Sequence, residues 1–138
     1  DAEKTHFGIF FGDNTGYFLA CNRLAEMYEH LGDNKNAEKY RTRAKEIKER
    51  LDEIAWNGKF YTHRIEEDDI DWELDVDEKS QIAQSNMYST NRGLTHEQNV
   101  AIMKTYLELK DNLPQGSPGE WYAIYQPFEK GFASHNEK

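Results

Sequence analysis

The sequence is poor in the residues that build several common kinds of site. Its one cysteine, Cys21, allows neither an internal disulfide nor the CxxC pairs of a zinc site. Its five histidines show no HxxxH or similar ligand spacing, and no serine lies in a GxSxG turn. No Gly-rich phosphate-binding loop is evident. We therefore expect no bound metal and no cofactor, and find no pattern of a serine hydrolase or a nucleotide site.

The chain also lacks long apolar runs and an excess of positive charge. No stretch approaches the ~20 apolar residues of a membrane span, so no membrane partner is expected. The formal net charge is -9, and no basic stripe offers the electrostatic footprint of nucleic-acid binding. Nine of the 26 acidic residues lie between Glu66 and Glu78, which leaves 17 to balance the 17 basic residues elsewhere. This run has no EF-hand spacing, so we interpret it as a solvated, extended segment.

What the sequence does have is helical periodicity. Two successive stretches repeat apolar residues at steps of three and four, which predicts two amphipathic helices. Gly32 is expected to end the first helix and Asp33 to cap the second, so the pair forms an antiparallel hairpin. The stripes are Tyr17, Cys21, Leu24, Tyr28 and Leu31 in the first helix, and Ala37, Tyr40, Ala44, Ile47, Leu51 and Ile54 in the second.

The rest of the chain predicts a small β element and two further helices. The dipeptide Asn57-Gly58 is typical of a tight turn, so we expect a short β excursion after the hairpin. A short helix is expected over about 79–89. A longer one follows to about residue 109 and begins at a capping box of Thr95 and Gln98. Its apolar residues form a wide stripe that needs partners on more than one side.

The main candidate site is an aromatic-rich loop, "GEWYAIYQPFEKGF" at 119–132. Flat side chains that stack on sugars, beside carboxylates that transfer protons, are what glycoside hydrolysis requires. Glu120 and Glu129 are the loop's only candidates for that proton transfer. The proposed stacking residues are Trp121, Tyr122, Tyr125 and Phe128. The competing interpretation, of equal weight, is that these aromatics fill a core edge while both glutamates face water.

Two other stretches carry candidate sugar-binding residues. Asn91 and Arg92 in "STNRG" have side chains that can donate hydrogen bonds to sugar hydroxyls, although a helix-ending turn at Gly93 is the favoured interpretation. In "GDNTG", Asp13 can bind a sugar hydroxyl, or Asp13 or Asn14 can cap the first helix. We favour the cap for one of these two.

These residues resemble helix pairs of the six-hairpin glycosidases, the (α/α)6-toroid superfamily that includes trehalases and processing α-glucosidases. The resembling features are a helix pair joined at "LGD", a Trp followed by "GKFY", and the pair "SQIAQSNMYSTNRGLTHEQNVAIMKTY". In addition, "PFEKGF" is similar to the "QEGFGW" loop that carries the catalytic base of trehalases. In that match Lys130 takes the position of the base, and Glu129 lies one residue before it.

The resemblance implies an all-α fold: helical hairpins of an (α/α)6 toroid, with a small β excursion and a long aromatic-rich loop. Residues 1–138 would then be a single partial domain of about two hairpins, with the family's general acid preceding residue 1. The implied function is hydrolysis of an oligosaccharide by carboxylate acid-base catalysis. Exposed hairpin flanks would make the isolated chain self-associate or leave it only marginally stable. The resemblance also favours a periplasmic or secreted parent protein.

Two rival functions stay open. A tetratricopeptide-like interaction module would explain the spacing of Leu24, Ala25, Tyr28, Ala37 and Ala44. Against it, the second helix runs past the end of a 34-residue repeat and no second copy follows. A carbohydrate-binding module without catalysis would keep the aromatic loop, but such modules are usually β-sandwiches and this chain is predicted to be mostly helical.

Overall fold

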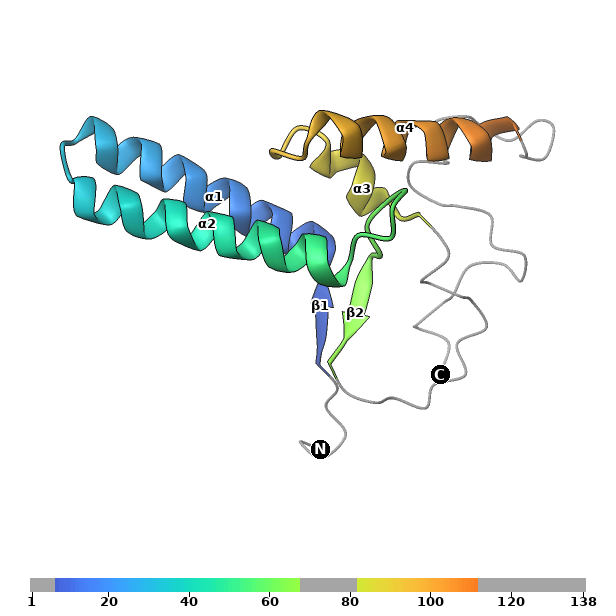
Figure 1. The fold of residues 1–138 in the computed structure, drawn as a ribbon, viewed down its shortest axis with the longest axis horizontal. Helices are drawn as coiled ribbons and strands as arrows, with labels where there is room; N and C mark the ends of the chain where they lie inside the picture. The colour runs from blue at the N-terminus through green and yellow to red at the C-terminus, as the bar shows by residue number, and fades with distance from the viewer. Residues whose placement is uncertain (1–6, 68–81, 112–138) are drawn as a thin grey trace.

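The computed structural model describes residues 7–67 and 82–111, and most of them are helical. The helices α1 (Phe11–His30) and α2 (Asn34–Ile54) form a long antiparallel hairpin (Figure 1). At the base of this hairpin, β1 (Gly8–Phe10) pairs with β2 (Arg64–Glu66) in a two-stranded antiparallel sheet. Two further helices follow, α3 (Gln84–Ser89) and α4 (His96–Asp111). For the described residues, a mostly helical fold with a small β excursion is confirmed.

The tip of the hairpin is built as predicted. Gly32 has a φ of 77°, in the left-handed region that glycine adopts without strain. Its N–H donates to the Glu29 carbonyl and the N–H of Asp33 donates to the Tyr28 carbonyl, both at 2.9 Å, which is a Schellman ending. The Asp33 carboxylate then accepts the backbone N–H of Asn36 at 3.1 Å. Gly32 therefore ends α1 and Asp33 caps α2.

The prediction for the start of α1 is wrong. The helix begins at Phe11, and its N-cap residue, Phe10, makes no side-chain capping bond. Asp13 lies in the first turn, and the side-chain amide of Asn14 donates to the Phe10 carbonyl at 2.8 Å. A side-chain cap is dispensable because the chain leaves β1 directly: the Phe11 N–H donates to the His63 carbonyl at 2.9 Å.

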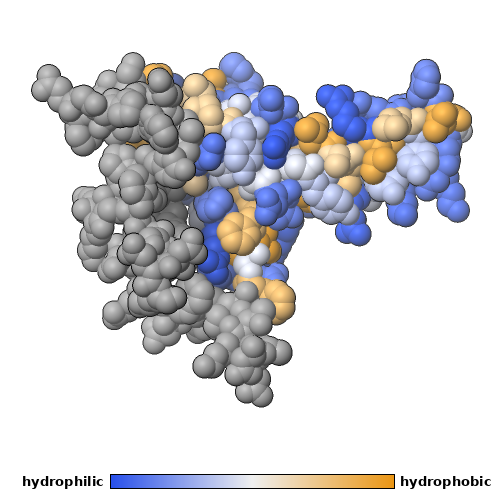
Figure 2. Space-filling view, turned by 180° about the vertical axis from the view of Figure 1, so that it is seen from behind, coloured by the Kyte–Doolittle hydropathy of each residue, from blue (hydrophilic) through white to orange (hydrophobic). Residues whose placement is uncertain are grey.

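The apolar stripe predicted for α1 divides between two faces of the helix. Cys21 is buried in the hairpin interior and the ring of Tyr28 stacks on Tyr40 of α2, whereas Leu24 and Leu31 are exposed, Leu31 by 76%. The reason is that α2 packs on the side where α1 carries the small, buried Ala25. The outer face of α1 consists of Tyr17, Leu24, Met27 and Leu31. Figure 2 shows apolar side chains along this upper edge of the hairpin, over α1.

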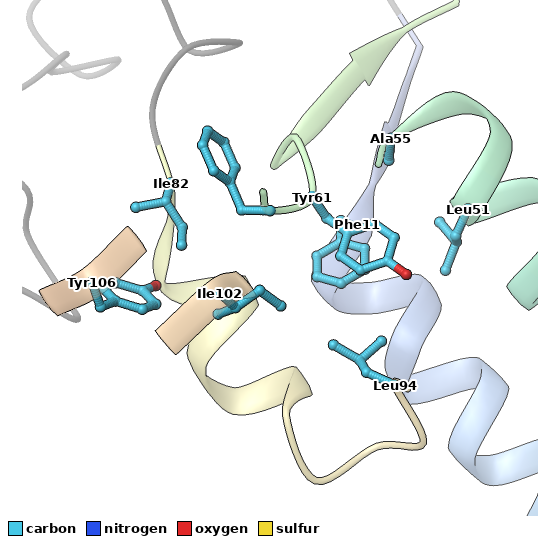
Figure 3. Packing of buried hydrophobic residues seen from close by; sticks show 9 residues of the cluster. Phe11, Leu51, Ala55, Tyr61, Ile82, Leu94, Ile102 and Tyr106 are labelled. Carbon is cyan, nitrogen blue, oxygen red and sulfur yellow. The ribbon is translucent and has the colours of Figure 1, made fainter. Parts of the chain in front are cut away.

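The main core lies at the base of the hairpin, where side chains from α1, α2, α4 and the connecting segments converge (Figure 3). Phe11 and Tyr61 stack with ring centroids 4.1 Å apart, and Trp56 packs on the same tyrosine. Trp56 and Tyr61 also form an antiparallel bridge around Gly58, whose φ is 94°. The predicted turn at Asn57-Gly58 is thus confirmed, and it delivers Tyr61 into the core.

The helix α3 begins at Gln84, later than predicted. Ala83 has an extended backbone and the side chain of Ile82 is buried in the core, so the chain is not yet helical at these two residues. Residues 79–81 lie outside the described residues. The buried amide of Asn86 fixes α3 by accepting the Tyr61 N–H and donating to the Tyr61 carbonyl, both at 2.8 Å.

The helix α4 begins at the predicted capping box. Gln98 Oε1 accepts the Thr95 N–H at 3.0 Å, and Thr95 Oγ1 accepts the Gln98 N–H at 3.2 Å. Ile102 and Tyr106 are buried on its inner side. Leu109 is partly buried and packs against the core, whereas Val100, Met103 and Leu107 are exposed and form the outer face of α4.

A polar cluster joins α2 to α4. Lys48 Nζ donates to both Asp52 carboxylate oxygens at 2.6 Å and to Gln98 Oε1 at 3.1 Å. Asp52 Oδ1 also accepts hydrogen bonds from Gln98 Nε2, at 3.0 Å, and from the Tyr61 hydroxyl. Partial burial raises the pKa of Asp52, but its hydrogen bonds and the Lys48 charge outweigh burial and hold the pKa below its ordinary value. Burial, and then the bond to Asp52, raises the Tyr61 pKa. This cluster is fully engaged in joining the two helices.

Candidate functional site

Three predicted sugar-binding residues lie in the part of the chain that the structure describes. Asp13 is exposed on the first turn of α1, Asn91 is exposed in the turn between α3 and α4, and Arg92 is half-buried in the same turn. The others, Glu120, Trp121, Tyr122, Tyr125, Phe128 and Glu129, lie outside the described residues, and so does most of the acidic run.

The turn that carries Asn91 and Arg92 is held in place by Gly93. This glycine has a φ of 90°, which a residue with a side chain rarely adopts. A Cβ at this position would also lie 2.7 Å from the ring of Phe18 on α1. The favoured interpretation of "STNRG" as a helix-ending turn is therefore confirmed, and the turn packs directly on α1.

Arg92 fastens this turn to the start of α1. Its Nη1 donates to the Gly12 carbonyl at 3.1 Å and to Thr15 Oγ1 at 3.2 Å. Thr15, which is buried, shares a 2.8 Å hydrogen bond with Ser89 at the end of α3. These bonds place Arg92 against Gly12, the residue before Asp13, although Asp13 and Arg92 are far apart in the sequence.

Tyr88 stands at the centre of this arrangement. The Arg92 guanidinium lies over its ring, 4.6 Å from the centroid, and 39% of the residue is exposed. Its hydroxyl lies where a Cβ of Gly12 would be, so this close approach requires a glycine. Burial raises the pKa of Tyr88; the Arg92 charge lowers this pKa and the Asp13 charge raises it. The phenol therefore stays protonated and is a hydrogen-bond donor.

The surface continues from Tyr88 toward the β-sheet. Ser85, one turn before Tyr88 on α3, contacts His63 Nδ1 at 3.1 Å through its hydroxyl. The His63 ring meets Phe10 edge-on with centroids 5.5 Å apart, and the Arg64 guanidinium lies over Phe10. Since Ser85 is only 1% exposed, its bond with His63 serves to dock α3 on the sheet and offers no accessible nucleophile.

A metal site and a membrane span were sought separately among the described residues. Within 7–67 and 82–111, no group of three or more His, Cys, Asp or Glu side chains could hold a metal ion. In the same ranges, no helix is both long and apolar enough to cross a membrane.

Tyr88, Gly12 and Thr15 are the site residues that sequence reasoning missed. Tyr88 lies four residues before Arg92 in "YSTNR", but one belongs to a helix and the other to a turn, so no single period connects them. In the sequence, Gly12 cannot be distinguished from any other glycine near the start of a helix. Only the structure shows that the Tyr88 hydroxyl approaches it closely. Only the position of α3 against α1, set by the tertiary fold, brings the three together.

Comparisons of the chain with protein-family models, with curated proteins and with solved structures found no match.

Proposed function

We propose that this chain is part of a glycoside hydrolase of the (α/α)6-toroid type, which cleaves an oligosaccharide by carboxylate acid-base catalysis. The architecture supports the proposal, because α1 and α2 form a long hairpin with a tight link and a second helix pair follows. Both α1 and α4 also keep an exposed apolar outer face, as helices do when further hairpins flank them.

The observation that carries the proposal is the meeting of two stretches that each contain candidate sugar-binding residues. The Arg92 guanidinium lies 4.6 Å from the centroid of the half-exposed Tyr88 ring, and Arg92 Nη1 donates to the carbonyl of Gly12, the residue before Asp13. A carboxylate, a guanidinium and a half-exposed aromatic ring are the groups that bind sugar hydroxyls and sugar C–H faces. Their convergence supports an oligosaccharide as the ligand.

For the chemistry we propose Glu129, and next Glu120, as the general base, with Trp121 and Tyr125 stacking on the sugar. Glycoside hydrolysis needs one carboxylic acid to protonate the leaving oxygen and one carboxylate to activate water or to attack. The resemblance implies that the acid is supplied from outside this sequence.

The test is a hydrolysis screen of the full-length protein against α- and β-linked disaccharides and aryl glycosides. Wild type is compared with Glu129→Gln and Glu120→Gln, and Glu108→Gln on α4 is the matched control. We expect one loop variant to lose at least about a thousandfold in kcat while circular dichroism and sugar binding stay unchanged. A folded wild-type protein that cleaves none of these glycosides would refute the proposal.

The tetratricopeptide-like alternative gains no support. A repeat of that kind fits two helices into about 34 residues, whereas α1 and α2 have 20 and 21 residues before their link is counted. No observation in the described ranges favours it over the glycosidase.

We also propose that the isolated chain self-associates through the outer faces of α1 and α4. Leu31 and Leu107 are 76% and 58% exposed, and apolar surface of this kind is normally covered. Sedimentation velocity should detect dimers or larger species at micromolar concentration. The double variant Leu24→Gln/Leu31→Gln should shift them toward monomer, whereas a wild-type chain that stays monomeric at 100 times that concentration contradicts the proposal.

A further inference from the structure

We propose that the outer face of α1 binds the same face of a second copy of this chain, with the two helices antiparallel. The contact surface, called the α1 seam below, consists of five exposed residues: Tyr17, Ala20, Leu24, Met27 and Leu31. This inference does not depend on the glycosidase function. It makes the self-association proposed above specific, because it names one face, one partner and one orientation.

The first argument is the spacing of the α1 seam. Its residues follow one another at steps of three, four, three and four, so they occupy successive a and d positions over two heptads. This pattern is separate from the contact with α2, which buries Cys21 and Ala25 on another side of α1. A second helix that packs at a shallow angle covers such a seam along its whole length, so the spacing indicates a helix as the partner.

The second argument is the lack of charge in the α1 seam. None of its five positions carries a charged residue, whereas Arg23 and Glu26, at neighbouring positions of α1, pair with each other at 2.8 Å. Depletion of charge is typical of the centre of a protein–protein interface. The seam is also preformed, because α1 is folded against α2, so binding costs no helix nucleation.

The length of the α1 seam indicates that its partner is a second α1. From Tyr17 to Leu31 the seam extends over about 21 Å at 1.5 Å per residue. The exposed apolar face of α4 runs only from Val100 to Leu107, over about 11 Å. The α4 face could therefore cover only half of the seam, whereas the seam of a second copy matches it from end to end.

Side-chain size selects the antiparallel orientation. With a two-fold axis between Leu24 and Met27, each of these residues faces the other in the second copy, and the small Ala20 faces the large Leu31. Large side chains opposite small ones fill the space between two helices without voids. In a parallel pair in register, Ala20 would face its own copy and leave a gap.

The base of the hairpin favours the same orientation. Arg92 Nη1 lies 3.5 Å from the position that a Cβ of Gly16 would take, so the turn between α3 and α4 lies at the base end of the α1 seam. In the antiparallel pair, this turn lies beyond the tip of the hairpin of the second copy. A parallel pair would instead bring the two turns side by side.

The first experiment is sedimentation velocity on the chain of residues 1–138, from about 1 μM to about 1 mM. We expect a reversible dimer with a Kd of about 10 μM, because the seam is only two heptads long. Leu24→Glu should weaken this dimer about tenfold or more, since it places a charge at the centre of an apolar interface. Leu107→Glu on α4 is the matched control and should keep the dimer while losing only larger species.

A mixture of two variants tests the orientation. Leu24→Glu and Met27→Lys should each dimerise about tenfold more weakly than wild type. In the antiparallel pair, position 24 of one copy faces position 27 of the other, so mixing the two variants brings opposite charges together and should restore dimers. Mixing cannot repair a variant that has simply unfolded, and circular dichroism verifies the fold of each variant.

The outcomes separate this inference from the proposals that precede it. A mixture that dimerises no better than either variant alone overturns the antiparallel pairing. A dimer that survives Leu24→Glu but is lost in Leu107→Glu overturns the assignment to α1 and leaves self-association in place. A wild-type chain that stays monomeric at about 1 mM refutes both. None of these measurements involves hydrolysis, so they leave the glycosidase proposal to its own test.

Discussion

The base and the tip of the α1–α2 hairpin are stabilised in different ways. At the base, large side chains such as Phe11 and Tyr61 stack in a shared core, and the Lys48–Asp52–Gln98 cluster ties α2 to α4. Toward the tip, the buried residues are small, with Ala25 on α1 and Ala37 on α2.

This difference shows that one hairpin can combine two kinds of packing. The base gains free energy mainly from burial of large apolar area, so it is sensitive to the loss of volume. Nearer the tip, small residues allow the helices to approach closely, so the packing is sensitive to added volume. Opposite substitutions should therefore be harmful at the two ends.

The largest effect is expected from removal of a ring at the base. Phe11→Ala leaves a cavity against Tyr61 and should lower the free energy of unfolding by about 3–5 kcal/mol, measured by urea denaturation. Phe10→Ala, which truncates the neighbouring and partly exposed phenylalanine, is the control and should cost about 1 kcal/mol or less. Equal losses in both variants would show that the base core is not the main source of stability.

Added volume near the tip should have an intermediate effect. Ala37→Leu forces a larger side chain between α1 and α2 and should destabilise the protein by about 1–3 kcal/mol. The adjacent Glu38→Leu places the same side chain on the exposed face of α2, and should change stability by less than about 0.5 kcal/mol. If Ala37→Leu is neutral, the tip is not closely packed.

The smallest effect concerns the polar cluster and depends on pH. The pKa of Asp52 is lower in the folded protein than in the unfolded chain, so its stabilising effect is complete above the unfolded pKa and is lost as pH falls through the folded pKa. Because Asp52 is partly exposed, solvent screening limits this contribution to about 1 kcal/mol. Asp52→Asn should lower stability at neutral pH and flatten its decline below pH 4. An acid profile equal to that of wild type would exclude Asp52 as a source of pH dependence.

Local signals predicted the hairpin well. Gly32, Asp33 and the Thr95–Gln98 box act through bonds to residues within five positions of themselves, so their effect is readable from short segments. The start of α1 was not readable in this way, because the first helical N–H is satisfied by His63, which follows a whole hairpin later in the chain.

The same limit applies to the candidate site. Asp13 and Arg92 were recognisable as polar residues in short turn-like stretches, and the structure brings them to one surface. Tyr88 was not recognisable, because its importance comes from the positions of Gly12 and Arg92 around it. The two faces of α1 were also confused, since steps of three and four describe an apolar helix without stating which side α2 will cover.

The single thiol of the protein has an experimental use that follows from its position. Cys21 is fully buried in the hairpin interior, so a thiol reagent can reach it only when α1 separates from α2. Its labelling rate under native conditions therefore measures how often the hairpin opens, and comparison with the rate of global unfolding distinguishes local from complete opening. The chain thus contains its own probe of motion in that hairpin.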